Sequence, residues 1–297
     1  MKIPYYPGCT LSTKAKGLDE TARAAANALG IEFVELPKWT CCGAAFPLVT
    51  DDVMAMVAPT RNLIYASKEG EKLVTLCSFC YNALKRANKT VKENPEKRDK
   101  LNDFIEEKYD GGVKVVHLLE VLRDEIGFKN LRERIKKDLG GLKVAPYYGC
   151  LLLRPFDEIE LDDPEDPHIF EEFLQALGCE VVNFPYKTEC CGSYLSVSPE
   201  TSEVVAKRTY SILSSALRNG AEAIATTCPL CHFNLDQKQD EVAAEHREFT
   251  KIPVLYFTQL LGLCMGIDEK FYHFDRHFLD PHPLLEEKGL LLGGGQG

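Results

Sequence analysis

The chain has 297 residues, of which 45% are hydrophobic and 27% charged, as is typical of a soluble globular protein of about two domains. Its net charge of −10 argues against nucleic acid as a partner, because binding phosphates requires clustered Lys and Arg. No stretch reaches the roughly 18 uninterrupted apolar residues of a membrane helix, and no signal peptide precedes the first predicted strand. We therefore expect a cytoplasmic protein whose cysteines stay reduced.

In the first part of the chain, short apolar segments alternate with longer segments of helical periodicity. Strands are expected near residues 2–6, 31–36, 72–76 and 113–117, and helices near 15–29, 51–69, 78–93 and 118–126. This alternation indicates βα units around a mostly parallel sheet, which is an α/β fold.

Ten of the twelve cysteines form two copies of one pattern: a single cysteine, an adjacent pair followed by glycine, and a CxxC motif. The first set consists of Cys9, Cys41, Cys42, Cys77 and Cys80, and the second set of Cys150, Cys190, Cys191, Cys228 and Cys231. The flanking segments repeat as well, which indicates a duplicated structural unit. We expect two pseudo-symmetric Rossmann-like units, residues 1–140 and residues 141–297, the second ending in a C-terminal tail.

The predicted strands bring the cysteines of each set together. Cys9, Cys41 and Cys77 each follow a predicted strand, and the carboxyl ends of parallel strands lie along one edge of a sheet. The second cysteine of each CxxC motif falls in the first turn of the next helix, where backbone N–H groups can donate to sulfur. Each unit therefore predicts one site of five thiol groups.

Five thiolates at one site restrict the chemistry that the site can perform. In a reducing compartment, clustered cysteines indicate metal or redox chemistry more than disulfides. Zinc takes four ligands, so a tetrahedral ion would leave one cysteine of each set unused, and a zinc-stabilised scaffold is a remote alternative. Iron–sulfur clusters are held by thiolates and contain several irons, which suits five cysteines. Cys179 and Cys264 lie outside the repeat and are expected to be core residues.

The order C, CCG, CxxC, occurring twice without an attached ferredoxin segment, resembles the CCG-domain family, and within it the B subunits of heterodisulfide reductases of methanogenic archaea. The resemblance implies that each set of five cysteines holds one non-cubane [4Fe–4S] cluster, with two clusters in all. It implies an oxidoreductase of methanogenesis that reduces the mixed disulfide of coenzyme M and coenzyme B, a small anionic disulfide, to two thiols. The implied partners are a ferredoxin-like C subunit together with a flavin-containing A subunit, and a hydrogenase or formate dehydrogenase in a larger assembly.

Two clusters suit this reaction, because cleaving a disulfide takes two electrons and a cluster normally passes one at a time. We therefore expect homolytic cleavage of the S–S bond between the clusters, with one electron from each. The alternative within the family is an iron–sulfur subunit of a lactate-, glycolate- or succinate-oxidising complex or of a thiol:fumarate reductase. Many of those carry a fused ferredoxin segment, which this sequence lacks.

Several side chains near the cysteines are weaker candidates for a role in the reaction. The candidates for catalysis are His232, Tyr81 and His117, which could donate a proton or simply pack beneath a cluster or cap a loop. The candidates for binding an anionic substrate are Lys38, Lys187 and Arg154. A solvated surface charge is the more common role of such cationic residues.

Overall fold

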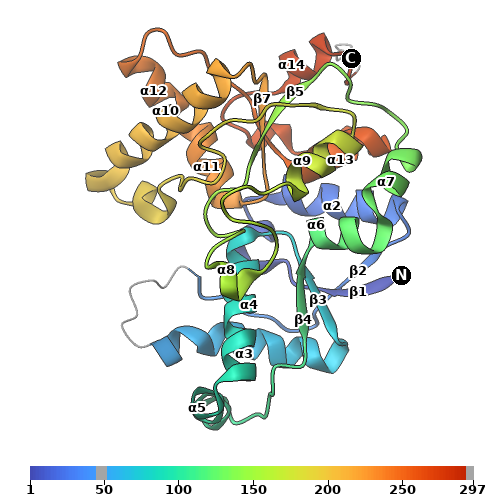
Figure 1. Ribbon diagram of the computed structural model, residues 1–297, viewed down its shortest axis with the longest axis vertical. Helices are drawn as coiled ribbons and strands as arrows, with labels where there is room; N and C mark the ends of the chain where they lie inside the picture. The colour runs from blue at the N-terminus through green and yellow to red at the C-terminus, as the bar shows by residue number, and fades with distance from the viewer. Residues whose placement is uncertain (45–51, 292–297) are drawn as a thin grey trace.

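The computed structural model describes residues 1–44 and 52–291, which form two α/β units, each built around its own four-stranded sheet (Figure 1). The strands of the first unit are β1 (Lys2–Tyr5), β2 (Glu32–Glu35), β3 (Lys72–Thr75) and β4 (Lys114–His117). Those of the second unit are β5 (Lys143–Tyr147), β6 (Glu180–Val181), β7 (Ala223–Thr226) and β8 (Val254–Tyr256). All pairings are parallel, and the orders β2-β1-β3-β4 and β6-β5-β7-β8 are equivalent. The prediction of two pseudo-symmetric α/β units is confirmed.

Helices cover the sheets in both units. The first unit contains α1 (Gly8–Leu11), α2 (Lys16–Ala28), α3 (Asp52–Glu69), α4 (Ser78–Glu93), α5 (Pro95–Ile105), α6 (Leu118–Val121), a π-helical turn (Leu122–Ile126) and α7 (Phe128–Arg134). The second contains α8 (Phe156–Ile159), α9 (Ile169–Ala176), α10 (Ser202–Arg218), α11 (Pro229–Gln237), α12 (Gln239–Glu245), α13 (Phe257–Met265) and α14 (His282–Glu287). The predicted helices of the first unit are found, although residue 51, the expected start of α3, lies outside the described residues.

Helix α5 was not expected, because its segment is highly charged and has little apolar periodicity. The Asn94 side chain caps it by accepting a hydrogen bond from the backbone of Lys97 at 3.0 Å, and Pro95 occupies the first turn. Only Leu101 of this helix is fully buried. Local capping, which a search for apolar periodicity overlooks, therefore specifies this helix.

The two units pack against each other through α2 and α13, which lie side by side at their junction (Figure 1). A Cβ atom on Gly262 would lie 2.4 Å from Cγ2 of Thr21, so only glycine permits this approach. Thr258 Oγ1 donates a hydrogen bond to the carbonyl of Leu18 at 3.1 Å across the same contact. One hydrophobic cluster runs through both units, and a second lies within the second unit. We propose that the boundary between the units lies at residues 140 and 141, because each sheet lies wholly on one side of it.

Within the described residues, no helix combines the length and the apolar composition that crossing a membrane requires.

Replacing Gly262 by alanine is expected to lower the free energy of unfolding by about 1–3 kcal/mol, because the added methyl group overpacks the contact between α2 and α13. Urea denaturation of the anaerobically purified protein measures the change. Ala28→Gln, at the exposed end of α2, is the control and should stay within about 0.5 kcal/mol of the parent. A Gly262→Ala protein as stable as its parent would show that the contact is not tight.

Candidate metal centres

The first set of cysteines lies at the carboxyl edge of the first sheet. Cys9 is in the short helix after β1, and Cys41 and Cys42 are in the loop that follows β2. Cys77 directly precedes α4, and Cys80 lies in the first turn of that helix. Three segments that are distant in sequence thus meet at one edge of the sheet, as the parallel topology predicts.

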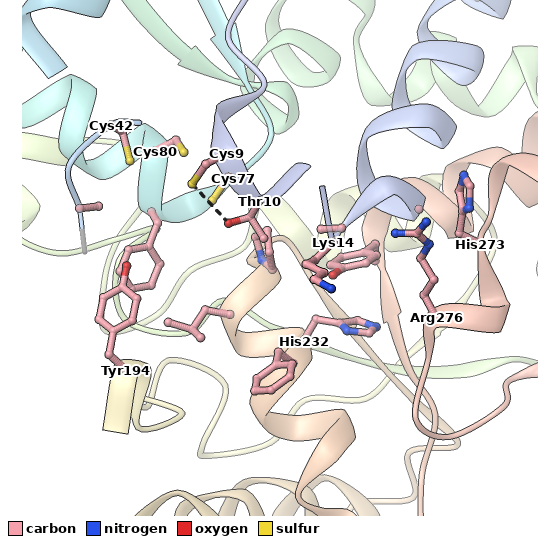
Figure 2. A pocket seen from close by; sticks show the side chains of 18 of the residues that line it. Cys9, Thr10, Lys14, Cys42, Cys77, Cys80, Tyr194, His232, His273 and Arg276 are labelled. Carbon is pink, nitrogen blue, oxygen red and sulfur yellow. Dashed lines mark hydrogen bonds between the residues drawn. The ribbon is translucent and has the colours of Figure 1, made fainter. Parts of the chain in front are cut away.

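The five sulfur atoms of the first set form one continuous chain of contacts. Figure 2 shows Cys9, Cys42, Cys77 and Cys80 close together at one side of the cavity. The Sγ atoms of Cys9 and Cys41 are 3.7 Å apart. Hydrogen bonds from Cys41 and Cys80 lower the pKa of Cys42, whereas hydrogen bonds to Cys42 and Cys77 raise the pKa of Cys80. These opposite shifts arise from S–H···S hydrogen bonds, which place the sulfur atoms of the set in contact with one another.

The second set is arranged in the same way in the second unit. A hydrogen bond from Cys150 lowers the pKa of Cys190 to about 6. Hydrogen bonds to Cys191 and Cys228 raise the pKa of Cys231. All cysteines of both sets are free thiols. The structure therefore brings together the members of each set that the sequence groups into one site.

A glycine in front of each set allows the sulfur atoms to converge. Gly8 precedes Cys9 with a φ of 72°, and a Cβ atom there would lie 2.8 Å from Cys80 Sγ. Gly149 precedes Cys150 with a φ of 65°, and a Cβ atom there would lie 3.1 Å from the sulfur of the last cysteine of its set. Both glycines supply a left-handed backbone and an open space beside sulfur, which no other residue supplies without strain.

Equivalent tyrosines fix the loop that carries the cysteine pair in each unit. The hydroxyl of Tyr6 donates to the carbonyl of Thr40, and that of Tyr147 donates to the carbonyl of Glu189, both at 2.7 Å. Each accepting residue directly precedes the cysteine pair of its unit. Both rings are fully buried, so the repeated tyrosines serve as rigid supports for the sites.

The two sites are linked directly to each other. The side-chain hydroxyls of Ser78, inside the first CxxC motif, and Thr227, next to the second, are hydrogen bonded at 2.7 Å. The side-chain amide of Asn82 in α4 donates to the carbonyls of Leu151 and Arg154, each at 2.8 Å, in the loop after Cys150. Helix α4 therefore holds the two sets of cysteines next to each other.

The surroundings of the two sets differ. All five cysteines of the first set line a cavity of about 700 Å³, whose opposite wall comes from α11 and from residues 273–278 (Figure 2). All five cysteines of the second set line a separate cavity of about 10 Å³. The ring of Phe79 lines both cavities and packs edge-on against Tyr194 at 5.2 Å between centroids. Among the described residues, the first set thus faces a space large enough for a small molecule and the second does not.

Of the three catalytic candidates, only His232 lines the large cavity. It is 5% exposed and stacks on Tyr256 at 4.1 Å, and its Nε2 atom has no hydrogen bond within the described residues. His117 caps α6, and burial lowers its pKa to about 4, so it is neutral near pH 7. Tyr81 is buried against His117 at 5.6 Å. Tyr81 and His117 form a pair in the first unit, and His232 and Tyr256 form the equivalent pair in the second unit with the two residue types exchanged. Of these two pairs, the second lines the large cavity.

None of the three cationic residues named from the sequence lines the large cavity. Lys38 is exposed at the surface. Lys187 is buried and forms an ion pair with Glu171 at 2.7 Å. Arg154 binds the carbonyl of Pro164 at 2.9 Å and the carboxylate of Glu165 at 2.8 Å. Lys187 and Arg154 therefore already have partners within the fold.

The cavity instead contains the cationic groups of Lys14 and Arg276 (Figure 2). Sequence reasoning missed both, because Lys14 lies in a turn and Arg276 in the C-terminal segment outside the repeat. The signal that could have pointed to Arg276 is the high density of ionisable residues from His273 to His277. Residues 273–278 lie beyond the second repeat and line the cavity of the first site. The repeat contains no equivalent segment, so it cannot predict their role.

Cys179 and Cys264 are buried outside both sets, as expected. Burial raises the pKa of both thiols, and the Cys264 sulfur donates to the carbonyl of Leu177 at 3.5 Å. They are core residues.

The sequence matches the cysteine-rich (CCG) domain family over residues 3–85 and 144–236, and the chain belongs to this family. It is 33% identical over 282 residues, 94% of this chain and 97% of the relative, to the 8-methylmenaquinol:fumarate reductase membrane anchor subunit of Wolinella succinogenes. It is 31% identical over 271 residues, 89% of each chain, to the B subunit of a ferredoxin/F420H2-dependent CoB–CoM heterodisulfide reductase of Methanosarcina acetivorans.

A protein of Archaeoglobus profundus that is named as similar to the heterodisulfide reductase B subunit is 32% identical over 276 residues, 90% of this chain and 92% of the relative. A hypothetical protein from Helicobacter pylori shares the fold at a TM-score of 0.73 and 13% identity, over 93% of this chain and 51% of that chain. This chain therefore spans about half of that solved chain. The family and the curated relatives support an iron–sulfur subunit of a reductase.

The two sets of cysteines suit iron–sulfur clusters. Each site offers five thiol groups, and a glycine leaves the space beside the last sulfur open. Five thiolates exceed the four ligands of a zinc ion and suit a cluster that contains several irons.

Replacing Gly8 by alanine is expected to remove iron from the first set and leave the second set loaded, because the new methyl group would clash with Cys80. Iron analysis and visible absorption of the anaerobically purified protein measure the loss. Gly30→Ala is the matched control, since Gly30 has a similar φ of 78° and no atom within 4 Å of the added Cβ. Equal iron in the Gly8→Ala and parent proteins would contradict this account of the site.

Proposed function

We propose that this chain is the catalytic iron–sulfur subunit of a disulfide reductase, and that its substrate is an anionic heterodisulfide such as that of coenzyme M and coenzyme B. One observation carries the proposal: the first set of cysteines and the cationic side chains of Lys14 and Arg276 line the same cavity of about 700 Å³. Relatives named as the B subunits of CoB–CoM heterodisulfide reductases support it.

The cofactors we propose are two non-cubane [4Fe–4S] clusters, one held by each set of five cysteines. When bound, they would supply one electron each for homolytic cleavage of the disulfide, RSSR′ + 2e⁻ + 2H⁺ → RSH + R′SH. The duplicated site matches a substrate that has two sulfur ends and takes up two electrons.

Lys14 and Arg276 would bind the anionic groups of the substrate. The side-chain ammonium of Lys14 forms no hydrogen bond or ion pair with the described residues. Arg276 donates through Nη1 to the carbonyl of Thr13 at 2.9 Å, which fixes the guanidinium and leaves other N–H groups for a ligand. His273, beside them, is hydrogen bonded to Glu20 at 2.7 Å. A fixed guanidinium and a free ammonium suit sulfonate, phosphate or carboxylate groups.

Phe79 and Tyr194 would place the disulfide and exclude water from it. Phe79 lies within the first CxxC motif and lines the cavities of both sets. A disulfide lying against this ring would be next to the first set, and cleavage between two clusters would require the ring to move so that the disulfide also reaches the enclosed second set. The polar ends of the substrate would then extend toward Lys14 and Arg276.

The electrons would come from other subunits. We propose a ferredoxin-like C subunit together with a flavin-containing A subunit in a cytoplasmic complex, to which a hydrogenase or formate dehydrogenase could be added. Relatives named as the B and D subunits of heterodisulfide reductases support membership of a multi-subunit complex.

A second candidate is the iron–sulfur subunit of a fumarate-, succinate-, lactate- or glycolate-linked complex. The relative named as an 8-methylmenaquinol:fumarate reductase subunit, with 97% of its length covered, favours it. Oxidation of a quinol also releases two electrons and two protons, and the rings of Phe79, Tyr194 and Tyr256 would suit a quinol in the cavity.

Anaerobic turnover with reduced viologen as donor tests the proposal. The anionic heterodisulfide of coenzyme M and coenzyme B should be reduced faster than simple neutral disulfides. Lys14→Met and Arg276→Met should each raise KM by roughly tenfold, the effect of losing one charge-assisted hydrogen bond, and leave the iron content unchanged.

Lys38→Met is the matched control, because Lys38 is exposed and does not line the cavity. Equal rates with neutral and anionic disulfides would contradict the proposed substrate. Oxidation of a menaquinol analogue without disulfide turnover would favour the second candidate.

A further inference from the structure

The backbone surroundings of the two sets of cysteines are closely matched. In the first set, the N–H groups of Gly43 and Ala44 donate to Cys41 and Cys42, respectively. In the second set, the N–H groups of Gly192 and Ser193 make the equivalent hydrogen bonds to Cys190 and Cys191. Backbone hydrogen bonds around the cysteine pair therefore do not distinguish one site from the other.

Side-chain contacts do distinguish them. In the first set, the Thr10 hydroxyl lies 3.8 Å from Cys9 Sγ, where the second set has Leu151 after Cys150. The second set has an amide contact instead. The amide nitrogen of Asn234 in α11 donates to Cys191 Sγ at 3.3 Å. Asn234 lies three residues after the last cysteine of its set, where the first set has Ala83. Alanine has no polar side-chain group, so the first set has no side-chain donor at this position. The difference could not be recognised as functional from the repeat alone, because it becomes an N–H···S contact only in the folded structure.

The orientation of this amide is fixed by its surroundings. The same nitrogen lies 3.0 Å from the carbonyl oxygen of Ser193 and 3.4 Å from that of Cys191. An amide oxygen in its place would face two carbonyl oxygens, so the nitrogen, and not the oxygen, occupies the position beside the sulfur. The amide oxygen of Asn234 is buried without a hydrogen bond among the described residues. A buried unpaired oxygen opposes folding, so the contacts of the amide nitrogen with the sulfur and the two carbonyl oxygens have to compensate for it.

We propose that Asn234 raises the reduction potential of the cluster held by the second set, which rests on the cluster assignment of the proposed function. A reduced cluster carries one more negative charge than an oxidised one, and a hydrogen bond to a ligand sulfur stabilises that charge. Asn234 is thus a positioning and tuning residue, since it acts through Cys191.

The need for such a donor follows from the different exposure of the two sets. Cys9 and Cys41 are exposed and face the large cavity, whereas Cys150 and Cys190 are only partly exposed around a small one. Enclosure away from water disfavours the added negative charge of reduction. The hydrogen bond from Asn234 offsets that enclosure, so both sites can accept an electron in a reaction that needs two.

Redox titration of the anaerobically purified chain, followed by electron paramagnetic resonance, tests this inference. Asn234→Leu keeps the approximate size of the side chain and removes the donor, and it should lower the potential of one cluster without shifting the other. Ala83→Asn supplies the missing donor to the first set and should raise the potential of the other cluster. Ala83→Leu is the matched control, which adds volume without a donor and should shift neither.

Unchanged potentials in an Asn234→Leu protein that retains its iron would overturn the inference. If Asn234→Leu loses iron from the second set, Ala83→Asn decides: a raised potential supports the inference and an unchanged one overturns it. The readout requires no substrate, so failure of disulfide turnover would count against the proposed function and leave this test intact.

Discussion

Five sulfur atoms from three separate segments have to meet at the carboxyl edge of each sheet, and the rest of the structure serves that convergence. The parallel strand order brings the segments to one edge. Gly8 and Gly149 then remove the Cβ atoms that would collide with the last sulfur of each set. Tyr6 and Tyr147 hold the loop that carries the cysteine pair. Topology alone would bring the thiols near each other, and these four residues bring them into contact.

Two copies of this arrangement lie next to each other, but their surroundings differ. The packing of α2 against α13 and the hydrogen bond between Ser78 and Thr227 join the two units. Residues 273–278 then extend over the first site, so one set of cysteines faces a cavity while the other is enclosed. The duplicated set of cysteines is thus an asymmetric pair, in which Asn234 places an amide donor at the enclosed site where the first site has Ala83.

Much of this could be predicted from the sequence, because repeated cysteines, strand periodicity and parallel topology each constrain the others. The strand positions, the two equivalent sheets and the grouping of the cysteines follow from those signals. The cavity did not follow, because its cationic residues come from segments that the repeat does not contain. Lys38, Lys187 and Arg154 lie close to the cysteines in sequence, but the fold turns Lys187 and Arg154 toward other partners.

The central claim is that each set of five cysteines holds an iron–sulfur cluster. Iron, acid-labile sulfide and zinc analysis of the anaerobically purified chain tests it most directly. We predict about eight iron and about eight sulfide per chain, since two clusters of four irons are expected, with little zinc. About one zinc ion per set and no labile sulfide would contradict the claim, and would make the chain a zinc-stabilised scaffold.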